Sequence, residues 1–375
     1  MGRNSEAMQQ FFGDLELDEP DKPNQQEGAA PPESDEDRER RALAIEEQLS
    51  EPSLALDFDK KDGVPDEIEV EVKVLDAAQV DKKSGPETVV VIGGLGEDLH
   101  VMTPFLRDLA LRGKQVVFIS MPGYGESSDP KSAWRESANK EGKVESKKDF
   151  SDYSNLIAAA LKKLRDNSKD FQIRPPAEKY SMVGHSLGGS IAADYAGRNP
   201  KNLKSLVLVA PAGYRKETVV SPLRIPPKIT WEFILAHFGE RMGRFLKGEW
   251  DGPAVVKKMW MDNALRRDVL NSFRSKTLKP RIIQRFWEAS VVAQGDLFKN
   301  IDAAAGQGVK VALVAGKQDM LFPVKDYEPE CQKRDHVDFE VMPGANHYSF
   351  IDKSDVYAQK ITEILKENTN HKNKE

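Results

Sequence analysis

The sequence has very little cysteine and no long apolar run. Cys331 is the single cysteine among 375 residues, so no disulfide can form within the chain. No window approaches eighteen apolar residues, and residues 1–20 lack the apolar run of a signal peptide, so we expect no membrane span and a cytoplasmic location. The sequence also lacks a Cys/His cluster and a His-Glu-x-x-His pattern, so we expect no metal and no cofactor.

Charge is distributed unevenly along the chain. Residues 1–60 contain 17 acidic and 6 basic side chains, whereas the remainder contains 44 acidic and 49 basic ones. An acidic segment repels phosphate, so we expect no nucleic-acid partner. The abundance of Glu, Asp, Gln and Pro predicts a disordered acidic extension over residues 1–60, in preference to a short helix over 37–49. Docking of this tail on a basic partner fits the same composition.

Strand and helix patterns alternate after the acidic segment. Residues 67–74 alternate polar and apolar side chains, which predicts a strand buried on one face and near a sheet edge. Further strands are predicted at 87–92, 115–120, 179–183, 204–209, 309–314 and 339–342, with helices at 99–112, 150–165, 187–198 and 356–367. This order predicts an α/β fold with a mostly parallel central sheet flanked by helices.

The alternation stops once, between residues 212 and 300. This stretch has helical pieces such as 231–246 and no convincing strand, which predicts a helical cap or lid. The predicted organisation is therefore an extension (1–60), a core in two parts (65–211 and 301–367), a cap (212–300) and a polar tail (368–375).

A Gly-x-Ser-x-Gly pattern follows the strand predicted at 179–183. An apolar strand leads into Gly184-His185-Ser186-Leu187-Gly188 and a helix of small residues leads out, as a strained strand–turn–helix requires. The two glycines leave room where side chains would clash. Ser186 would stand at a helix N-terminus, which favours developing negative charge, with the Leu187 amide facing an oxyanion. Ser186 is therefore the predicted nucleophile.

A serine nucleophile needs a base, and the sequence offers six histidines. His347 follows a predicted strand and turn, which places it at the carboxyl edge of the sheet, whereas the side chain of His185 is expected to point elsewhere. Asp319 lies on the loop after another strand and is the predicted partner that orients His347. Asp326 and Asp338 remain alternatives to Asp319.

Two further sets of residues are assigned to the predicted site. The turn at residues 93–96 (Gly-Gly-Leu-Gly) follows a strand, and the Leu95 amide is the predicted second oxyanion donor. A dinucleotide loop is excluded there, because Asp98 stands where the third glycine would be. In the cap, Trp231, Phe233 and Phe238 are predicted to line an apolar substrate pocket.

Together these segments resemble the α/β-hydrolase superfamily, specifically its lid-bearing esterase, lipase and carbon–carbon hydrolase-like members. The resemblance covers residues 65–367 and rests on residues 93–96, 121–127, 184–189, 316–319 and 344–347. It implies triad roles for Ser186, Asp319 and His347. The chain departs from many members at Gly93, where they have His, and at Met121, where they have Asp.

The resemblance implies cleavage of a carboxylic ester in a small-molecule acyl substrate, through an acyl-enzyme intermediate. Carbon–carbon cleavage, amide cleavage and acyl transfer use the same triad and remain open. A non-catalytic binding protein of this fold is the alternative from a different functional class.

Overall fold

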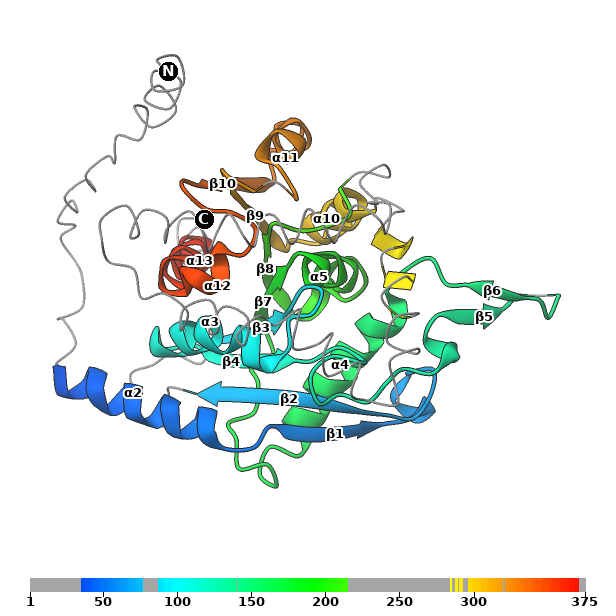
Figure 1. The fold of residues 1–375 in the computed structure, drawn as a ribbon, viewed down its shortest axis with the longest axis horizontal. Coiled ribbons are helices and arrows are strands. Elements are labelled where there is room, and N and C mark those ends of the chain that lie inside the picture. Colours follow the sequence, from blue (N-terminus) through cyan, green and yellow to red (C-terminus); the bar gives the residue numbers. More distant parts are fainter. Residues whose placement is uncertain are drawn as a thin grey trace, which may run out of the picture.

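A central eight-stranded sheet organises the protein (Figure 1). The computed structural model describes residues 35–76, 87–139, 141–214, 284, 287–288, 290–292, 296–319 and 321–370. In spatial order the sheet runs β1-β2-β4-β3-β7-β8-β9-β10. Its strands are β1 (Leu54–Phe58), β2 (Ile68–Asp76), β3 (Thr88–Ile92), β4 (Gln115–Ile119), β7 (Tyr180–His185), β8 (Leu203–Val209), β9 (Lys310–Gly316) and β10 (Val337–Met342). β2 is antiparallel to β1 and β4, and the other pairs are parallel, which confirms the predicted mostly parallel sheet.

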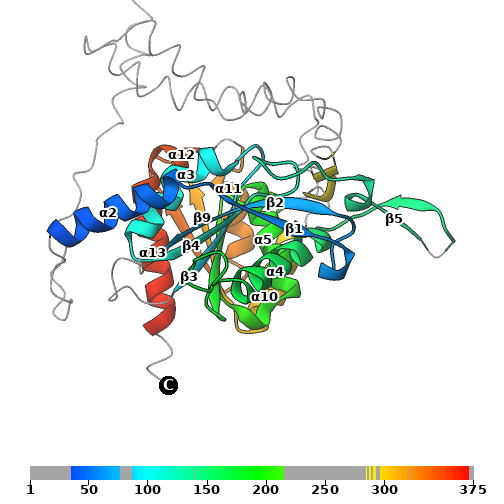
Figure 2. The same ribbon diagram turned by 90° about the horizontal axis from the view of Figure 1, so that it is seen from below.

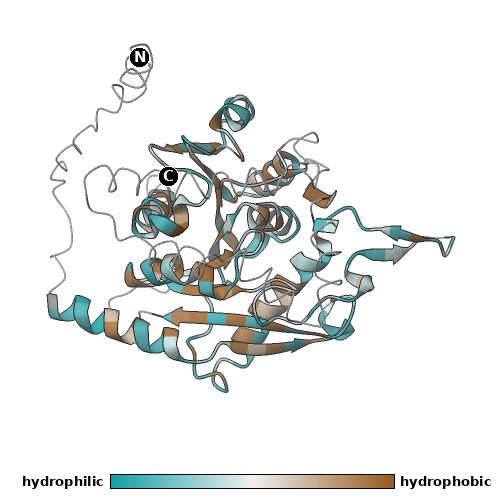
Figure 3. Cartoon of the chain, viewed as in Figure 1, coloured by the Kyte–Doolittle hydropathy of each residue, from teal (hydrophilic) through white to brown (hydrophobic). Residues whose placement is uncertain are grey.

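Helices cover both faces of the sheet and create two apolar cores (Figures 1 and 2). One core lies under α4 (Ser151–Asp166), α5 (Leu187–Arg198), α10 (Leu297–Ala305) and α11 (Val324–Cys331). The other lies under α2 (Asp35–Ser50), α3 (Leu99–Leu111), α12 (Ser349–Asp352) and α13 (Ser354–Asn370). Short 3₁₀ turns are η1 (Lys60–Asp62), η3 (Ser132–Trp134) and η4 (Pro200–Asn202). Figure 3 shows the same layering, with apolar residues concentrated in the central strands.

The structure corrects the later part of the prediction that residues 1–60 form a disordered extension, whereas residues 1–34 lie outside the described residues. Residues 35–50 form α2, and Leu54–Phe58 form β1, which pairs with β2. Ile45 is fully buried in the core under α3, and Arg41 donates to the carbonyl of Leu111. The few apolar residues of this segment pack against the sheet and α3. The average composition of the segment does not reveal this packing.

The prediction that β2 is buried on one face only is also wrong. Glu71 and Lys73 were expected to face solvent, but only 6% and 4% of their surfaces are exposed. The N-terminal segment covers this second face: Ser53 donates to the Glu71 carboxylate, and the Lys73 amine donates to the carbonyl of Glu51 at 2.6 Å. Burial accordingly lowers the pKa of Lys73. β2 does lie near a sheet edge, as predicted, with only β1 outside it.

Only the two ends of the predicted cap lie within the described residues, with 212–214 at the start and parts of 284–300 at the end. Trp287 and Glu288 are buried against the core, where Glu288 accepts hydrogen bonds from the hydroxyls of Tyr124 (2.9 Å) and Tyr153 (2.6 Å). These contacts fix the chain where it re-enters the α/β core. Trp231, Phe233 and Phe238 lie outside the described residues.

Two smaller features complete the description. A hairpin of β5 (Glu136–Ala138) and β6 (Val144–Ser146) projects from the body (Figure 1), and α13 continues to Asn370, into the predicted polar tail. None of the helices that the structure describes has the length and apolar character needed to cross a membrane.

Candidate active site

Ser186 occupies a strained turn between β7 and α5, which we call the nucleophile elbow (residues 184–188). Its backbone has φ 51° and ψ −117°, a conformation that costs a non-glycine residue roughly 1–3 kcal/mol. Surrounding hydrogen bonds hold it: the Ser186 amide donates to Val209 at 3.0 Å, and its carbonyl accepts from Gly189 and Ala212. The packed turn therefore fixes the serine at the carboxyl edge of the sheet.

The glycines of the nucleophile elbow are required by close backbone packing. A Cβ atom on Gly184 would lie 2.5 Å from the carbonyl oxygen of Gly188. One on Gly188 would collide with the carbonyls of Ile92 and Gly93 on the neighbouring strand end. The spacing of the two glycines is thus set by the approach of α5 to β7 and β3.

His347 and Asp319 meet beside the nucleophile elbow. His347 Nδ1 lies 2.9 Å from Asp319 Oδ2, and the two residues are 4% and 3% exposed. The other Asp319 oxygen, Oδ1, accepts from the amides of Leu321 (2.9 Å) and Phe322 (2.8 Å). Three nitrogen atoms on two loops thus fix the carboxylate, and through it the orientation of the imidazole. The ring of His347 lies 4.8 Å from that of His185, the residue before Ser186.

The two alternative carboxylates lie elsewhere. Asp326 accepts from the Tyr214 hydroxyl at 2.8 Å, and Asp338 is exposed on β10. Of the three candidates, Asp319 is the one that contacts His347. His336 is also separate, since its Nε2 lies 2.9 Å from Asp302 at the surface.

Backbone amides gather around Ser186. Gly94 packs so closely that a Cβ there would lie 2.9 Å from Ser186 Cβ. The Gly94 amide donates to the Glu97 carboxylate, whereas the Leu95 and Leu187 amides donate to no protein acceptor among the described residues. The Leu95 and Leu187 amides, which were expected to bind an oxyanion, therefore remain available for it. The neighbouring Gly94 amide is already hydrogen-bonded.

A second histidine–carboxylate pair, which the sequence analysis missed, lies behind this loop. His185 Nδ1 is 2.7 Å from Glu97 Oε1, and His185 Nε2 is 3.0 Å from the carbonyl oxygen of His347. His185 and Glu97 are 2% and 5% exposed. The pair connects the loop at residues 93–96 to the backbone of His347. The available signal in the sequence was an acidic residue, Glu97, three positions after Gly94. This spacing belongs to no recognised motif.

Aromatic side chains lie around His347. The rings of Phe322 and Tyr348 each lie 5.2 Å from the His347 ring. Tyr327 is fully buried on α11, where its hydroxyl donates to Pro211 at 2.6 Å. Burial, and secondarily the charge of Asp319, hold the pKa of Tyr327 well above its ordinary value. Among the described residues, no three His, Cys, Asp or Glu side chains cluster as a metal site would require.

Comparison with known proteins fits this geometry. Residues 87–354 match the family described as "alpha/beta hydrolase fold". The chain belongs to this family. The fold class and the superfamily predicted from the sequence are thereby confirmed, and the strand–elbow–helix arrangement around Ser186 lies within the matched range.

Individual relatives are more distant. The chain is 24% identical over 296 residues to abhydrolase domain-containing protein abhd-5.2 of Caenorhabditis elegans, covering 74% of this chain and 59% of the relative. It is 27% identical over 196 residues to a probable 1-acylglycerol-3-phosphate O-acyltransferase of Oryza sativa subsp. japonica, covering 50% and 42%. The chain thus spans only about half the length of these curated relatives. A solved structure, a probable hydrolytic enzyme from Pseudomonas aeruginosa PAO1, shares the fold at a TM-score of 0.51 and 17% identity, covering 84% of this chain and 94% of that one.

Proposed function

We propose that the protein is a serine hydrolase that cleaves a carboxylic ester of a small acyl substrate through an acyl-enzyme intermediate. The observation that carries the proposal is the buried His347–Asp319 hydrogen bond beside a serine held at φ 51°. A strained serine at a helix N-terminus, a fixed imidazole and free amides are the three parts that acyl transfer needs.

Each residue has one role in the proposed reaction. His347 removes the proton from Ser186 Oγ as the oxygen attacks the ester carbonyl. Asp319 holds His347 so that Nδ1 faces the carboxylate and Nε2 faces the reacting atoms. The Leu95 and Leu187 amides donate to the oxyanion of the tetrahedral intermediate. His347 then protonates the leaving alkoxide, and water, activated by the same imidazole, releases the acid and regenerates the serine.

Labelling with a fluorophosphonate probe, followed by hydrolysis of p-nitrophenyl esters of graded acyl length, tests the proposal. We expect the wild-type protein to be labelled. Ser186→Ala should abolish labelling and lower ester turnover by on the order of 10⁶-fold, because the attacking atom is removed. The matched control is Ser128→Ala, which alters an exposed serine and should label as the wild type does.

Absence of labelling in a folded wild-type protein would contradict the proposal and favour a non-catalytic binding protein of the same fold. Labelling that persists in Ser186→Ala would also contradict it, since another residue would then be the nucleophile.

Acyl transfer to an alcohol is the second candidate, favoured by the similarity to the rice protein described as a probable 1-acylglycerol-3-phosphate O-acyltransferase. Both reactions form the acyl-enzyme and differ only in whether water or an alcohol attacks it. Adding 1-acylglycerol-3-phosphate to the ester assay distinguishes them. Capture of most acyl groups by this acceptor would favour transfer, and an unchanged yield of free acid would favour hydrolysis.

A further inference from the structure

A cavity of about 720 Å³ lies at the amino edge of the sheet, at the opposite end of β7 from Ser186. Tyr180 begins β7 and lines the cavity, whereas Ser186 follows the last residue of the strand. A strand rises about 3.3 Å per residue, so the two sites are roughly 20 Å apart. The cavity is therefore distinct from the candidate active site. We call it the amino-edge cavity.

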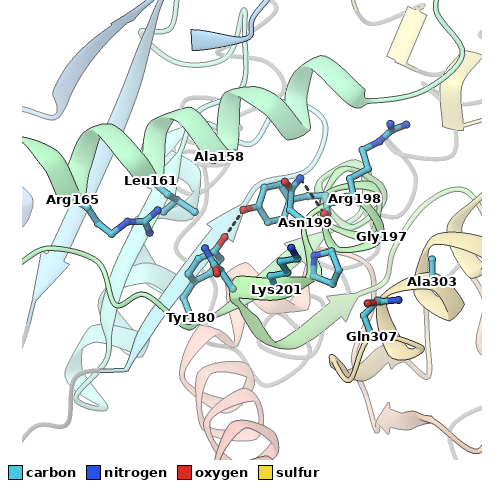
Figure 4. A pocket seen from close by; sticks show the side chains of 13 residues that line it. Ala158, Leu161, Arg165, Tyr180, Gly197, Arg198, Asn199, Lys201, Ala303 and Gln307 are labelled. Carbon is cyan, nitrogen blue, oxygen red and sulfur yellow. Dashed lines mark hydrogen bonds between the residues drawn. The ribbon is translucent and has the colours of Figure 1, made fainter.

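The polar side chains that line the amino-edge cavity are cationic or neutral, and none of the described lining residues carries a carboxylate. Its walls come from α4, the start of β7, the end of α5, η4 and the end of α10 (Figure 4). The lining side chains that carry charge or hydrogen-bonding groups are Arg165, Tyr180, Tyr195, Arg198, Asn199, Lys201, Asn202 and Gln307. All the charged groups among them are positive, which favours an anionic ligand.

Of the three cations that line the cavity, Arg198 is paired with carboxylates, whereas Arg165 and Lys201 contact no carboxylate among the described residues. The Nη1 atom of Arg165 is buried and has no hydrogen-bond acceptor within the described part of the chain. Arg198, in contrast, contacts Asp194 at 2.7 Å and Asp149 at 2.9 Å, and it points away from Tyr180 in Figure 4. A buried guanidinium nitrogen without an acceptor is unfavourable, and an oxyanion bound in the cavity would supply the acceptor that the described residues do not.

Two buried tyrosines add a further donor. The hydroxyls of Tyr180 and Tyr195 are hydrogen-bonded to each other, an arrangement that uses one of their two protons and leaves one for a ligand. Arg165 reaches from α4 toward Tyr180 (Figure 4), and its charge counteracts the burial that raises the pKa of both phenols. The guanidinium and the phenols thus face the same space.

We propose that the amino-edge cavity binds the phosphate group of a small phosphate ester, with Arg165 as its principal ligand. Two N–H groups of the Arg165 guanidinium donate to two phosphate oxygens. The remaining phenol proton and the Lys201 amine donate to a third oxygen. The phosphate fills only part of the cavity, and the amides of Asn202 and Gln307 face the remainder, where they suit a hydroxyl-bearing organic part.

The affinity is expected to be modest. α4 and α5 both end at this edge, and the carbonyls of a helix C-terminus disfavour an anion. Binding must therefore come from Arg165 and Lys201, and we expect a Kd for inorganic phosphate of about 1 mM.

Isothermal titration calorimetry of the full-length protein tests the proposal, with inorganic phosphate at constant ionic strength and chloride as the reference anion. Arg165→Met keeps the side-chain length and removes the donor, and it should weaken phosphate binding by about tenfold or more. The matched control is Lys162→Met, which removes an exposed cation from the same helix outside the cavity and should leave the Kd unchanged. Arg165→Lys, which keeps the charge, should retain part of the affinity, and thermal unfolding checks that each variant is folded.

Two further probes distinguish the source of the phosphate. Tighter binding of glucose 6-phosphate than of inorganic phosphate would identify a soluble ester. Sedimentation with phosphatidic acid vesicles that Arg165→Met reduces would identify a lipid headgroup. Either result supports the phosphate site. No phosphate binding up to about 20 mM, roughly twenty times the expected Kd, or equal affinities in the wild type and Arg165→Met would overturn it.

Discussion

Two buried histidine–carboxylate pairs among the described residues are similar in geometry and differ in what they hold in place. His347 and Asp319 are joined through Nδ1 at 2.9 Å, and His185 and Glu97 through Nδ1 at 2.7 Å. The second nitrogen of His185 faces the carbonyl oxygen of His347 at 3.0 Å. A carbonyl only accepts hydrogen bonds, so His185 Nε2 carries a proton and cannot act as a base. Adjacency to Ser186 in the sequence therefore does not make His185 a catalytic base.

The contrast lies in what supports each pair. Asp319 is held by amides of its own loop, so its pair is supported locally. Glu97 instead accepts from the Gly94 amide, so its pair connects the loop beside Ser186 to the loop that carries His347. In the proposed reaction, His347 moves the proton and Asp319 orients His347, whereas His185 and Glu97 would set the distance between these groups and the loop beside Ser186.

The largest expected effect comes from removing the proposed base. His347→Ala should lower ester turnover by on the order of 10⁶-fold, because Ser186 then has no group to take its proton. Steady-state hydrolysis of a p-nitrophenyl ester measures the loss. His336→Ala, which removes a histidine paired with Asp302 at the surface, serves as the control and should alter turnover less than about twofold. Comparable losses in both variants would indicate a general effect of histidine removal on folding.

A smaller loss is expected from Asp319→Asn, which keeps the shape of the side chain and removes its charge. The amide would turn an NH₂ toward His347 Nδ1 and favour the wrong tautomer, so kcat should fall by on the order of 10⁴-fold with KM little changed. Asp326→Asn tests the alternative carboxylate, which contacts Tyr214 and should have a minor effect. The reverse order of the two losses would reassign the orienting role to Asp326.

The smallest effect is expected for the second pair. Glu97→Gln should lower kcat by about 10- to 100-fold, because the loop at residues 93–96 loses its carboxylate anchor and the amides move relative to Ser186. As Glu97 is a positioning residue, fluorophosphonate labelling of Ser186 should persist at a reduced rate. Glu126→Gln alters an exposed carboxylate nearby and is the matched control. Complete loss of labelling in folded Glu97→Gln would place Glu97 among the reacting groups.

The sequence predicted the parts of this site that depend on local pattern. The strand into Gly184, the helix out of Gly188 and the position of His347 after a strand and turn each follow from neighbouring residues. The Glu97–His185 contact could not be predicted in this way, because it joins residues 88 positions apart. Burial of Glu71 and Lys73 escaped prediction for a similar reason: strict alternation indicates an exposed face only when no other segment covers it.

Because of the N-terminal segment, the folded unit begins before the range that matches the family. The family match starts at residue 87, but β1 and β2 precede it and complete one edge of the sheet. A protein trimmed to residue 87 would leave β4 with an open row of backbone amides and carbonyls, and one trimmed to residue 60 would do the same to β2. Open strand edges promote association between copies. Shortened versions that begin at either position are therefore expected to aggregate during expression, whereas one that begins at residue 35 retains the whole sheet.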